Sequence, residues 1–155
     1  MGRSPRVDVA GGLYHALNRG NAKNPIFFKD EDYLAFERIV VQGLEKFPVD
    51  LFAYQWMNNH WHMVLSPQTD GGMGVFLSWV TLTHTQRYHA HHGTTGWGHV
   101  YQGRFRAFQF RMMTIFLLRA GTSSEMRKLP VWLSVPKTIS GVAFTTGLAA
   151  IQRSA

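Results

Sequence analysis

The chain has 155 residues, no cysteine and a formal net charge of +7. This length supports one compact domain with a substantial core and is short for two. The absence of cysteine excludes a disulfide framework and a thiolate zinc site, and no apolar run approaches the ~18 residues of a membrane span. Since no charged segment followed by an apolar one opens the chain, we expect a soluble protein located in the cytoplasm.

The positive charge is concentrated in the C-terminal part of the sequence. Residues 1–110 carry ten Lys and Arg against eight Asp and Glu, whereas residues 111–155 carry six against Glu125 alone. A net positive charge ordinarily favours a nucleic-acid partner, because Lys and Arg release counterions from phosphates. Here this uneven distribution weakens the argument from net charge.

Apolar spacing predicts the first two elements. Residues 12–19 form a strand, with His15 and Leu17 on one of its faces. A helix begins at Asp30 and ends at Pro48, because three acidic residues lie at its positive end and apolar residues follow at helical spacing. These apolar residues are Tyr33, Phe36, Ile39, Val40, Leu44 and Phe47.

A hairpin and a second helix follow. Residues 50–57 and 60–66 are predicted to pair around a turn of two asparagines, and a helix runs from about residue 73 to 91. A last strand is available within residues 100–108. The apolar side expected for the second helix consists of Val75, Leu77, Trp79, Val80, Leu82 and Thr83. This order of elements predicts an α+β fold of the ferredoxin-like, split βαβ type, with an antiparallel sheet and two helices on one face.

A pair of histidines begins the second arm of this hairpin. His60 and His62 are two residues apart, so their side chains point to the same face of a strand, whereas Trp61 points to the opposite face. Two neutral imidazoles on one face supply half of a divalent-metal site, and a metal held there can polarise a phosphate. The alternative interpretation is a pair of partly exposed histidines without a ligand role.

A glycine-spaced, aromatic and basic segment covers residues 97–106. Its rings can stack on bases and its arginines can pair with phosphates. The alternative is a strand in which Val100 and Phe105 are core residues while Arg104 and Arg106 are merely solvated, and spacing does not decide between the two. A metal cluster is one interpretation of five further histidines, but a histidine-rich helix end that faces water explains most of them. These five are His84, His89, His91, His92 and His99.

Four stretches of the sequence resemble the REP-associated tyrosine transposases, within the single-tyrosine HUH transposase superfamily. They are specific in combination: Tyr14–Asn21 (YHALNRGN), Asn59–Pro67 (NHWHMVLSP), Thr83–His92 (THTQRYHAHH) and Gly98–Arg106 (GHVYQGRFR). The resemblance implies a ferredoxin-like nuclease fold that acts on single-stranded DNA next to hairpins with a magnesium or manganese ion. In that family the ion polarises the scissile phosphate while a tyrosine hydroxyl attacks it, which forms a 5′-phosphotyrosine and releases a 3′-hydroxyl.

The resemblance assigns roles to individual residues. His60 and His62 match the two metal ligands of the HUH motif, and no third ligand is assigned. The family nucleophile has no match, because residues 111–155 contain no tyrosine. Tyr88 is the fallback nucleophile, with an aromatic packing or capping role as the alternative. The residues expected to contact DNA, in a monomer or homodimer, are Asn18, Arg19, Gln102, Arg104 and Arg106.

The resemblance ends abruptly after the last predicted strand, and the genetic code suggests why. Met112 and Met113 have the single codon ATG, so reading one base back through them and the following threonine gives two consecutive Asp, as in an acidic run of the family. With permitted codons, residues 115–127 then read Phe-Leu-Thr-Pro-Cys-Arg-Tyr-Val-Glu-Arg-Asn-Ala, which contains a family-like tyrosine segment. We therefore predict a transposase-like domain at residues 1–110 and an out-of-frame tail at 111–155, with a naturally diverged C-terminus as the alternative.

Two functions of different class follow. The first is a transposase-like single-stranded DNA endonuclease and strand-transfer protein, impaired in this chain because the tyrosine is missing. The second is a catalytically dead remnant that still binds hairpin DNA. A third hypothesis is a generic metal hydrolase, which needs a third metal ligand and a substrate pocket that the sequence does not reveal.

Overall fold

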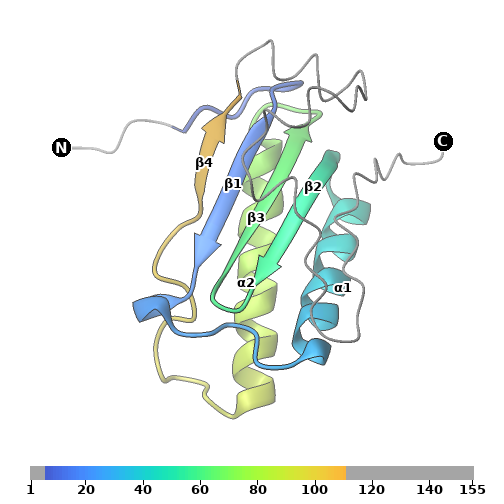
Figure 1. The fold of residues 1–155 in the computed structure, drawn as a ribbon. Coiled ribbons are helices and arrows are strands. Elements are labelled where there is room, and N and C mark those ends of the chain that lie inside the picture. The colour runs from blue at the N-terminus through green and yellow to red at the C-terminus, as the bar shows by residue number, and fades with distance from the viewer. Residues whose placement is uncertain (1–5, 111–155) are drawn as a thin grey trace, which may run out of the picture.

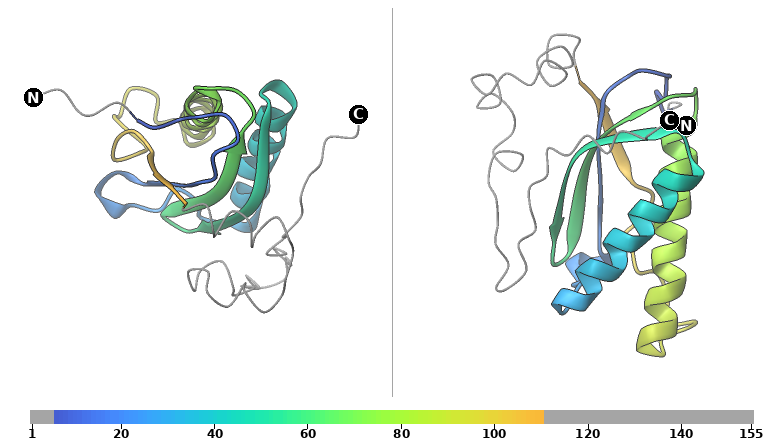
Figure 2. Two further views of the ribbon diagram at one scale, coloured as in Figure 1. Left: turned by 90° about the horizontal axis from the view of Figure 1, so that it is seen from above. Right: turned by 90° about the vertical axis from the view of Figure 1, so that its right-hand side faces the viewer.

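The computed structural model describes residues 6–110, and the predicted tail lies outside them. These residues form a four-stranded antiparallel sheet with two helices (Figure 1). Figure 2 shows both helices on the same side of the sheet. We call the other face, on which no helix of residues 6–110 lies, the uncovered face. In chain order the elements are β1 (Tyr14–Arg19), the short 3₁₀ helix η1 (Asn21–Lys23), α1 (Asp30–Lys46), β2 (Val49–Met57), β3 (His60–Pro67), α2 (Gly72–His92) and β4 (Arg106–Gln109).

The strand order in the sheet is β2-β3-β1-β4, and every neighbouring pair is antiparallel. The strand that follows α1 therefore lies at one edge, and β1 is separated from it by β3. This arrangement is the predicted α+β, split βαβ architecture. Within residues 6–110, no helix is long and apolar enough to span a lipid bilayer.

The core lies between the sheet and the helices. Trp61, Met63 and Leu65 of β3 expose none of their surface, and they pack in one cluster with the apolar side predicted for α1. Burying a large apolar side chain stabilises the fold by about 1.5–3 kcal/mol. Because side chains alternate along a strand, burial of these three residues directs His60 and His62 to the uncovered face.

The prediction of which side of α2 is buried was partly wrong. Val75 and Leu82 are exposed, and the buried side consists of Gly72, Met73, Phe76, Leu77, Val80 and His84. Apolar residues surround much of this helix, so its sequence does not fix which side faces the sheet. Contact with α1 decides the rotation of the helix, because Phe76 packs where Gly43 of α1 has no side chain.

The last strand is shorter than predicted. Residues 100–105 form a loop, in which Tyr101 makes one isolated bridge with Gly20. Val100 and Tyr101 are adjacent and both buried, and Phe105 is buried as well. Adjacent strand residues point to opposite faces, so a strand beside one helix layer cannot bury both neighbours in the same core.

Candidate metal centre and nucleic-acid interface

His60 and His62 lie on the uncovered face of the sheet. In the register of β1 and β3, Arg19 is opposite His60 and Leu17 is opposite His62, and opposite residues share a face. The ring centroids of the two histidines are 5.0 Å apart. The expectation that both side chains point the same way is met, and the binding of a metal by them stays a prediction.

A third imidazole joins this pair. The distance from His15 Nε2 to His62 Nδ1 is 2.9 Å, and the two rings stack with centroids 5.1 Å apart. His15 is opposite Val64, so it lies diagonally across from His62 on the same face. The sequence placed His15 on one face of a strand but did not assign it to the site. The signal that was missed is the antiparallel register of β1 and β3, which brings diagonal neighbours into contact.

Burial keeps these imidazoles neutral near pH 7. It lowers the pKa of His15 to about 4. The pKa of His62 is lowered to about 4 as well, first by burial and then by the nearby His15, His60 and Arg19. Burial and then the charge of Arg19 lower the pKa of His60. Neutral imidazole is the form of histidine that binds a metal.

Asn59 contacts His60 at the start of β3. Its Oδ1 lies 2.6 Å from His60 Nδ1, and its Nδ2 donates a hydrogen bond of 3.2 Å to the carbonyl oxygen of Lys23. The backbone around it is also tied down, because the carbonyl oxygen of Asn59 accepts from the amide of Gly20 at 2.8 Å. Both ends of the Asn59 amide are therefore engaged.

The donor set fits a hard divalent ion only in part. Among the residues described, no group of three or more His, Cys, Asp or Glu side chains could hold a metal. Gln55 is opposite His62 in the register of β2 and β3, and its Oε1 is buried without a hydrogen-bond partner. Amide oxygens are ligands that Mg²⁺ and Mn²⁺ accept, and imidazole suits several divalent metals. The pair of imidazoles and this unpartnered oxygen are chemically compatible with such an ion.

The residues expected to contact DNA fall on two surfaces. Arg19 of β1 and Arg106 of β4 are exposed, and their register positions opposite His60 and Leu17 place both on the uncovered face. These two arginines therefore flank the histidines.

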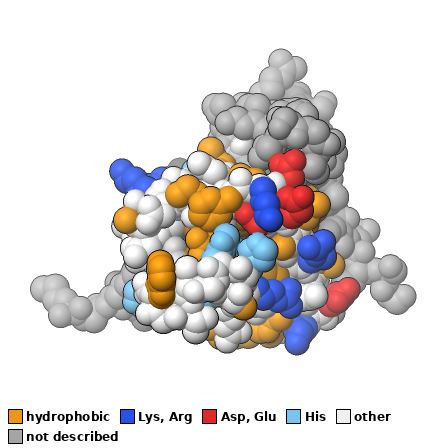
Figure 3. Space-filling model, turned by 90° about the horizontal axis from the view of Figure 1, so that it is seen from below, with side chains coloured by type: hydrophobic (Ala, Val, Ile, Leu, Met, Phe, Trp, Pro, Cys, Tyr) orange, Lys and Arg blue, Asp and Glu red, His pale blue; other side chains and the backbone are white. Residues whose placement is uncertain are grey.

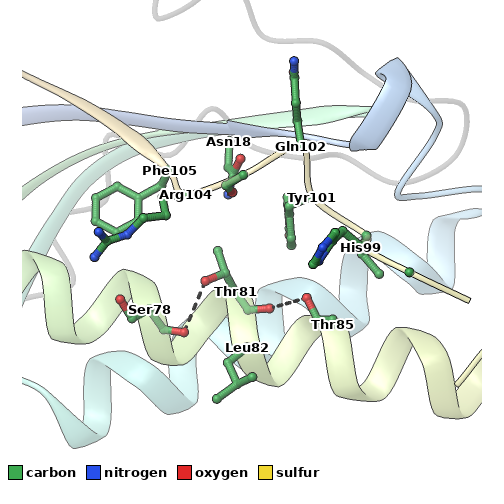
Figure 4. A pocket seen from close by; sticks show the side chains of 13 residues that line it. Asn18, Ser78, Thr81, Leu82, Thr85, His99, Tyr101, Gln102, Arg104 and Phe105 are labelled. Carbon is green, nitrogen blue, oxygen red and sulfur yellow. Dashed lines mark hydrogen bonds between the residues drawn. The ribbon is translucent and has the colours of Figure 1, made fainter. Parts of the chain in front are cut away.

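The other three line a cavity of about 430 Å³ on the helix side, between α2 and the loop before β4 (Figure 4). Gln102 and Arg104 are exposed there. Asn18 is buried, and its Nδ2 donates to the carbonyl oxygen of Gly103 at 3.2 Å. Asn18 therefore holds the loop against β1, which is a structural contact that the sequence did not indicate.

All five tyrosines of the chain lie within the described residues, and each belongs to the helix side of the sheet. Tyr14 is buried and Tyr54 donates to Glu37 of α1, while Tyr101 contacts α2. Tyr33 and Tyr88 belong to α1 and α2 themselves. The sheet therefore separates every tyrosine from the face that carries His60 and His62.

The fallback nucleophile Tyr88 packs among aromatic rings. Its ring centroid is 4.3 Å from that of His92 and 6.5 Å from that of Phe28. The structure does not bring Tyr88 together with the histidine pair.

The remaining histidines have different surroundings. His91, His92 and His99 are exposed, and Figure 3 shows histidine side chains at the surface of the end of the molecule toward which α2 runs. The prediction that His84 belongs to a water-facing helix end was wrong. His84 is buried, and its Nδ1 lies 2.6 Å from the Tyr101 hydroxyl. His84 faces the core because α2 is rotated differently from the prediction.

Known proteins share this fold. Two solved structures resemble the chain. The first is a REP-associated tyrosine transposase bound to a REP hairpin, with a TM-score of 0.57, 14% identity and coverage of 78% of this chain and 75% of that one. The second is a protein of Deinococcus radiodurans R1 that is described as a candidate transposase, with a TM-score of 0.54, 14% identity and coverage of 77% of this chain and 92% of that one. At this identity the likeness concerns the fold. None of the curated proteins compared with the chain matches it significantly.

A family model described as "Transposase IS200 like" matches residues 8–119, which is well over half of the sequence. This match confirms the resemblance to single-tyrosine transposases. The chain belongs to the IS200-like transposase family.

Proposed function

We propose that this chain is a transposase-like protein that binds single-stranded or hairpin DNA on the uncovered face of its sheet and lacks the nucleophile for strand transfer. One observation carries the proposal. His60 and His62 share that face, while all five tyrosines belong to the other side of the sheet. The REP hairpin bound by the structural relative supports hairpin DNA as the partner.

The residues of the uncovered face have separable tasks. His60 and His62 would hold Mg²⁺ or Mn²⁺, which when bound polarises the scissile phosphate. Arg19 and Arg106 would neutralise neighbouring phosphates and orient the strand. No side chain on this face supplies a tyrosine hydroxyl. Positioning a nucleophile in line with the leaving oxygen is worth about 7–11 kcal/mol, which a water from bulk solvent does not replace.

The missing nucleophile is explained by the reading frame of the C-terminal segment. We place the functional domain at residues 1–110 and treat residues 111–155 as translated out of frame, which removes the family tyrosine. A protein in this state retains the means to bind DNA. Its function is then that of a hairpin-binding remnant of a strand-transfer enzyme.

Covalent adduct formation tests this proposal. The purified chain, incubated with Mn²⁺ or Mg²⁺ and a hairpin-flanked single strand, should form no denaturation-resistant protein–DNA adduct. A restored chain, in which the residues after Phe110 are replaced by the shifted-frame translation, should form one. The double variant His60→Ala and His62→Ala of the restored chain is the control and should lose it. An adduct formed by the original chain and abolished by Tyr88→Phe would contradict the proposal.

A further inference from the structure

His60 and His62 each make a hydrogen bond through their own Nδ1. His60 Nδ1 is 2.6 Å from Asn59 Oδ1, and His62 Nδ1 is 2.9 Å from His15 Nε2. A neutral imidazole carries its proton on one nitrogen and its lone pair on the other. The partner of Nδ1 therefore decides whether Nε2 of each ring can bind a cation.

The contact with Asn59 has one possible direction. The Nδ2 of Asn59 donates to the carbonyl oxygen of Lys23, which orients Oδ1 toward His60. An amide oxygen only accepts, so His60 Nδ1 carries the proton and donates it. The lone pair of His60 is then on Nε2.

The contact between His15 and His62 has two possible directions. If His15 donated, the proton of neutral His62 would lie on Nε2 and this ring would have no lone pair for a cation. If His62 donates through Nδ1, the lone pair lies on Nε2 in both rings of the pair. Only the second direction makes the two rings equivalent.

We propose that Asn59 and His15 are positioning residues that fix His60 and His62 as Nδ1-protonated tautomers, so that each ring would bind a divalent cation through Nε2. The role in cation binding rests on the proposed function, whereas the tautomers are properties of the metal-free protein. Outer partners of this kind orient metal-binding histidines and raise their basicity. His15 acts through His62, in agreement with the absence of a converging group of three ligands among the described residues.

The tautomers can be measured directly. Long-range ¹H–¹⁵N spectra of the metal-free protein should show His60 and His62 protonated at Nδ1. His15→Phe keeps an aromatic ring and removes the acceptor, so His62 should move toward the Nε2-protonated form while His60 stays unchanged. His15→Gln offers an amide oxygen and should restore the His62 tautomer. Leu17→Ala, opposite His62 and without a hydrogen-bonding group, is the matched control and should change neither ring.

Calorimetric titration with Mn²⁺ gives the second readout. His15→Phe should weaken Mn²⁺ binding by about 10- to 100-fold, with recovery in His15→Gln and no change in Leu17→Ala. Circular dichroism and urea unfolding of each variant verify that the fold is retained. A wild-type His62 protonated at Nε2, or a His62 tautomer that His15→Phe leaves unchanged, would overturn the proposal for His15.

The failure of the proposed function is distinguishable from the failure of this inference. Two results would show that His60 and His62 are not metal ligands: a wild-type chain that binds no Mn²⁺, or a double variant His60→Ala and His62→Ala that binds it as well as the wild type does. Either result contradicts both the metal site of the proposed function and the role of these tautomers in cation binding. The spectra then still decide whether His15 and Asn59 fix the tautomers. Adduct formation by the restored chain does not enter either measurement.

Discussion

The His84 Nδ1 and the Tyr101 hydroxyl lie 2.6 Å apart in the protein interior and join the middle of α2 to the loop before β4. The same hydroxyl accepts a hydrogen bond of 3.2 Å from Trp61 Nε1. Trp61 stands between His60 and His62 in β3, so this network anchors the strand segment that carries the candidate site. Burial raises the pKa of Tyr101, and its hydroxyl therefore stays protonated.

Tyr101→Phe should destabilise the protein. The substitution keeps the ring and removes the hydroxyl, which leaves the buried nitrogens of Trp61 and His84 without this partner. A buried polar group without a partner costs about 1–3 kcal/mol, so the free energy of unfolding should fall by that order. Urea denaturation measures the change. Tyr88→Phe removes a hydroxyl that makes no hydrogen bond to another residue within 6–110, and it should have a much smaller effect.

Stability should decrease as the pH falls below about 6.5, the ordinary pKa of histidine. Burial, and then the nearby His92, lower the pKa of His84 to about 4, although Asp32 acts in the opposite direction. The unfolded chain therefore binds a proton at a higher pH than the folded one. Stability from this group is complete above pH 6.5 and is lost as the pH falls toward 4.

For His84 the loss between pH 7 and pH 5 amounts to about 2 kcal/mol. Urea unfolding at both pH values should therefore show a shallower decline for His84→Gln than for the wild type. His15 and His62 contribute in the same direction, so the decline should not vanish. His91→Gln removes an exposed histidine of the same helix and is the control. An identical decline in wild type and His84→Gln would contradict the assignment.

The periodicity of the sequence was sufficient to predict the first helix and the hairpin. The first helix and both arms of the hairpin were placed to within a residue or two, because their apolar spacing has one clear period and their ends carry acidic, proline or asparagine signals. The shared face of His60 and His62 follows from the same period of two. Such features depend on neighbouring residues in the chain.

Features that depend on distant residues could not be predicted in this way. The contact of His15 with His62 requires the register of β1 against β3. The burial of His84 requires the rotation of α2 against α1, which packing decides. Val100, Tyr101 and Phe105 in the loop at residues 100–105 are buried because tertiary contacts, and not a regular spacing, bring them into the core.

Substitution of the arginines should separate the two candidate DNA surfaces. Arg19→Ala and Arg106→Ala should weaken binding of a hairpin-flanked single strand, because both arginines lie on the face of the histidine pair. Arg104→Ala tests whether the cavity beside α2 also contacts DNA, and we expect weaker binding here too. Each lost phosphate contact should reduce the slope of log affinity against log salt by about 0.7 for a single strand.

Fluorescence anisotropy at several salt concentrations measures these slopes. Arg87→Ala makes the same change of charge on α2, where the arginine donates to Gln42 of α1, and it is the matched control. Equal effects of Arg87→Ala and Arg106→Ala would show that DNA binding depends on the overall charge of the protein and not on the position of Arg106. A slope unaffected by Arg104→Ala would remove the cavity surface from the DNA interface.

Gly43→Ala should destabilise the protein although alanine is the better helix former. In the interior of a helix this exchange is ordinarily favourable by about 1 kcal/mol. Gly43 is buried where α1 meets α2, and an added Cβ would lie 2.7 Å from Phe76 Cε2 and 3.2 Å from Val80 Cγ2. Overpacking of a core typically costs about 1–3 kcal/mol, which exceeds the gain in helix propensity.

Urea unfolding should therefore give a lower free energy of unfolding for Gly43→Ala than for the wild type. The control is Gln42→Ala, at the neighbouring exposed position of α1, which should be close to neutral. The double variant Gly43→Ala with Phe76→Leu tests the cause, because a smaller side chain on α2 makes room for the methyl group. The effect of Gly43→Ala should be weaker in the Phe76→Leu background than in the wild type. Equal effects in both backgrounds would show that Phe76 is not the obstacle and that the helix contact is looser than the structure indicates.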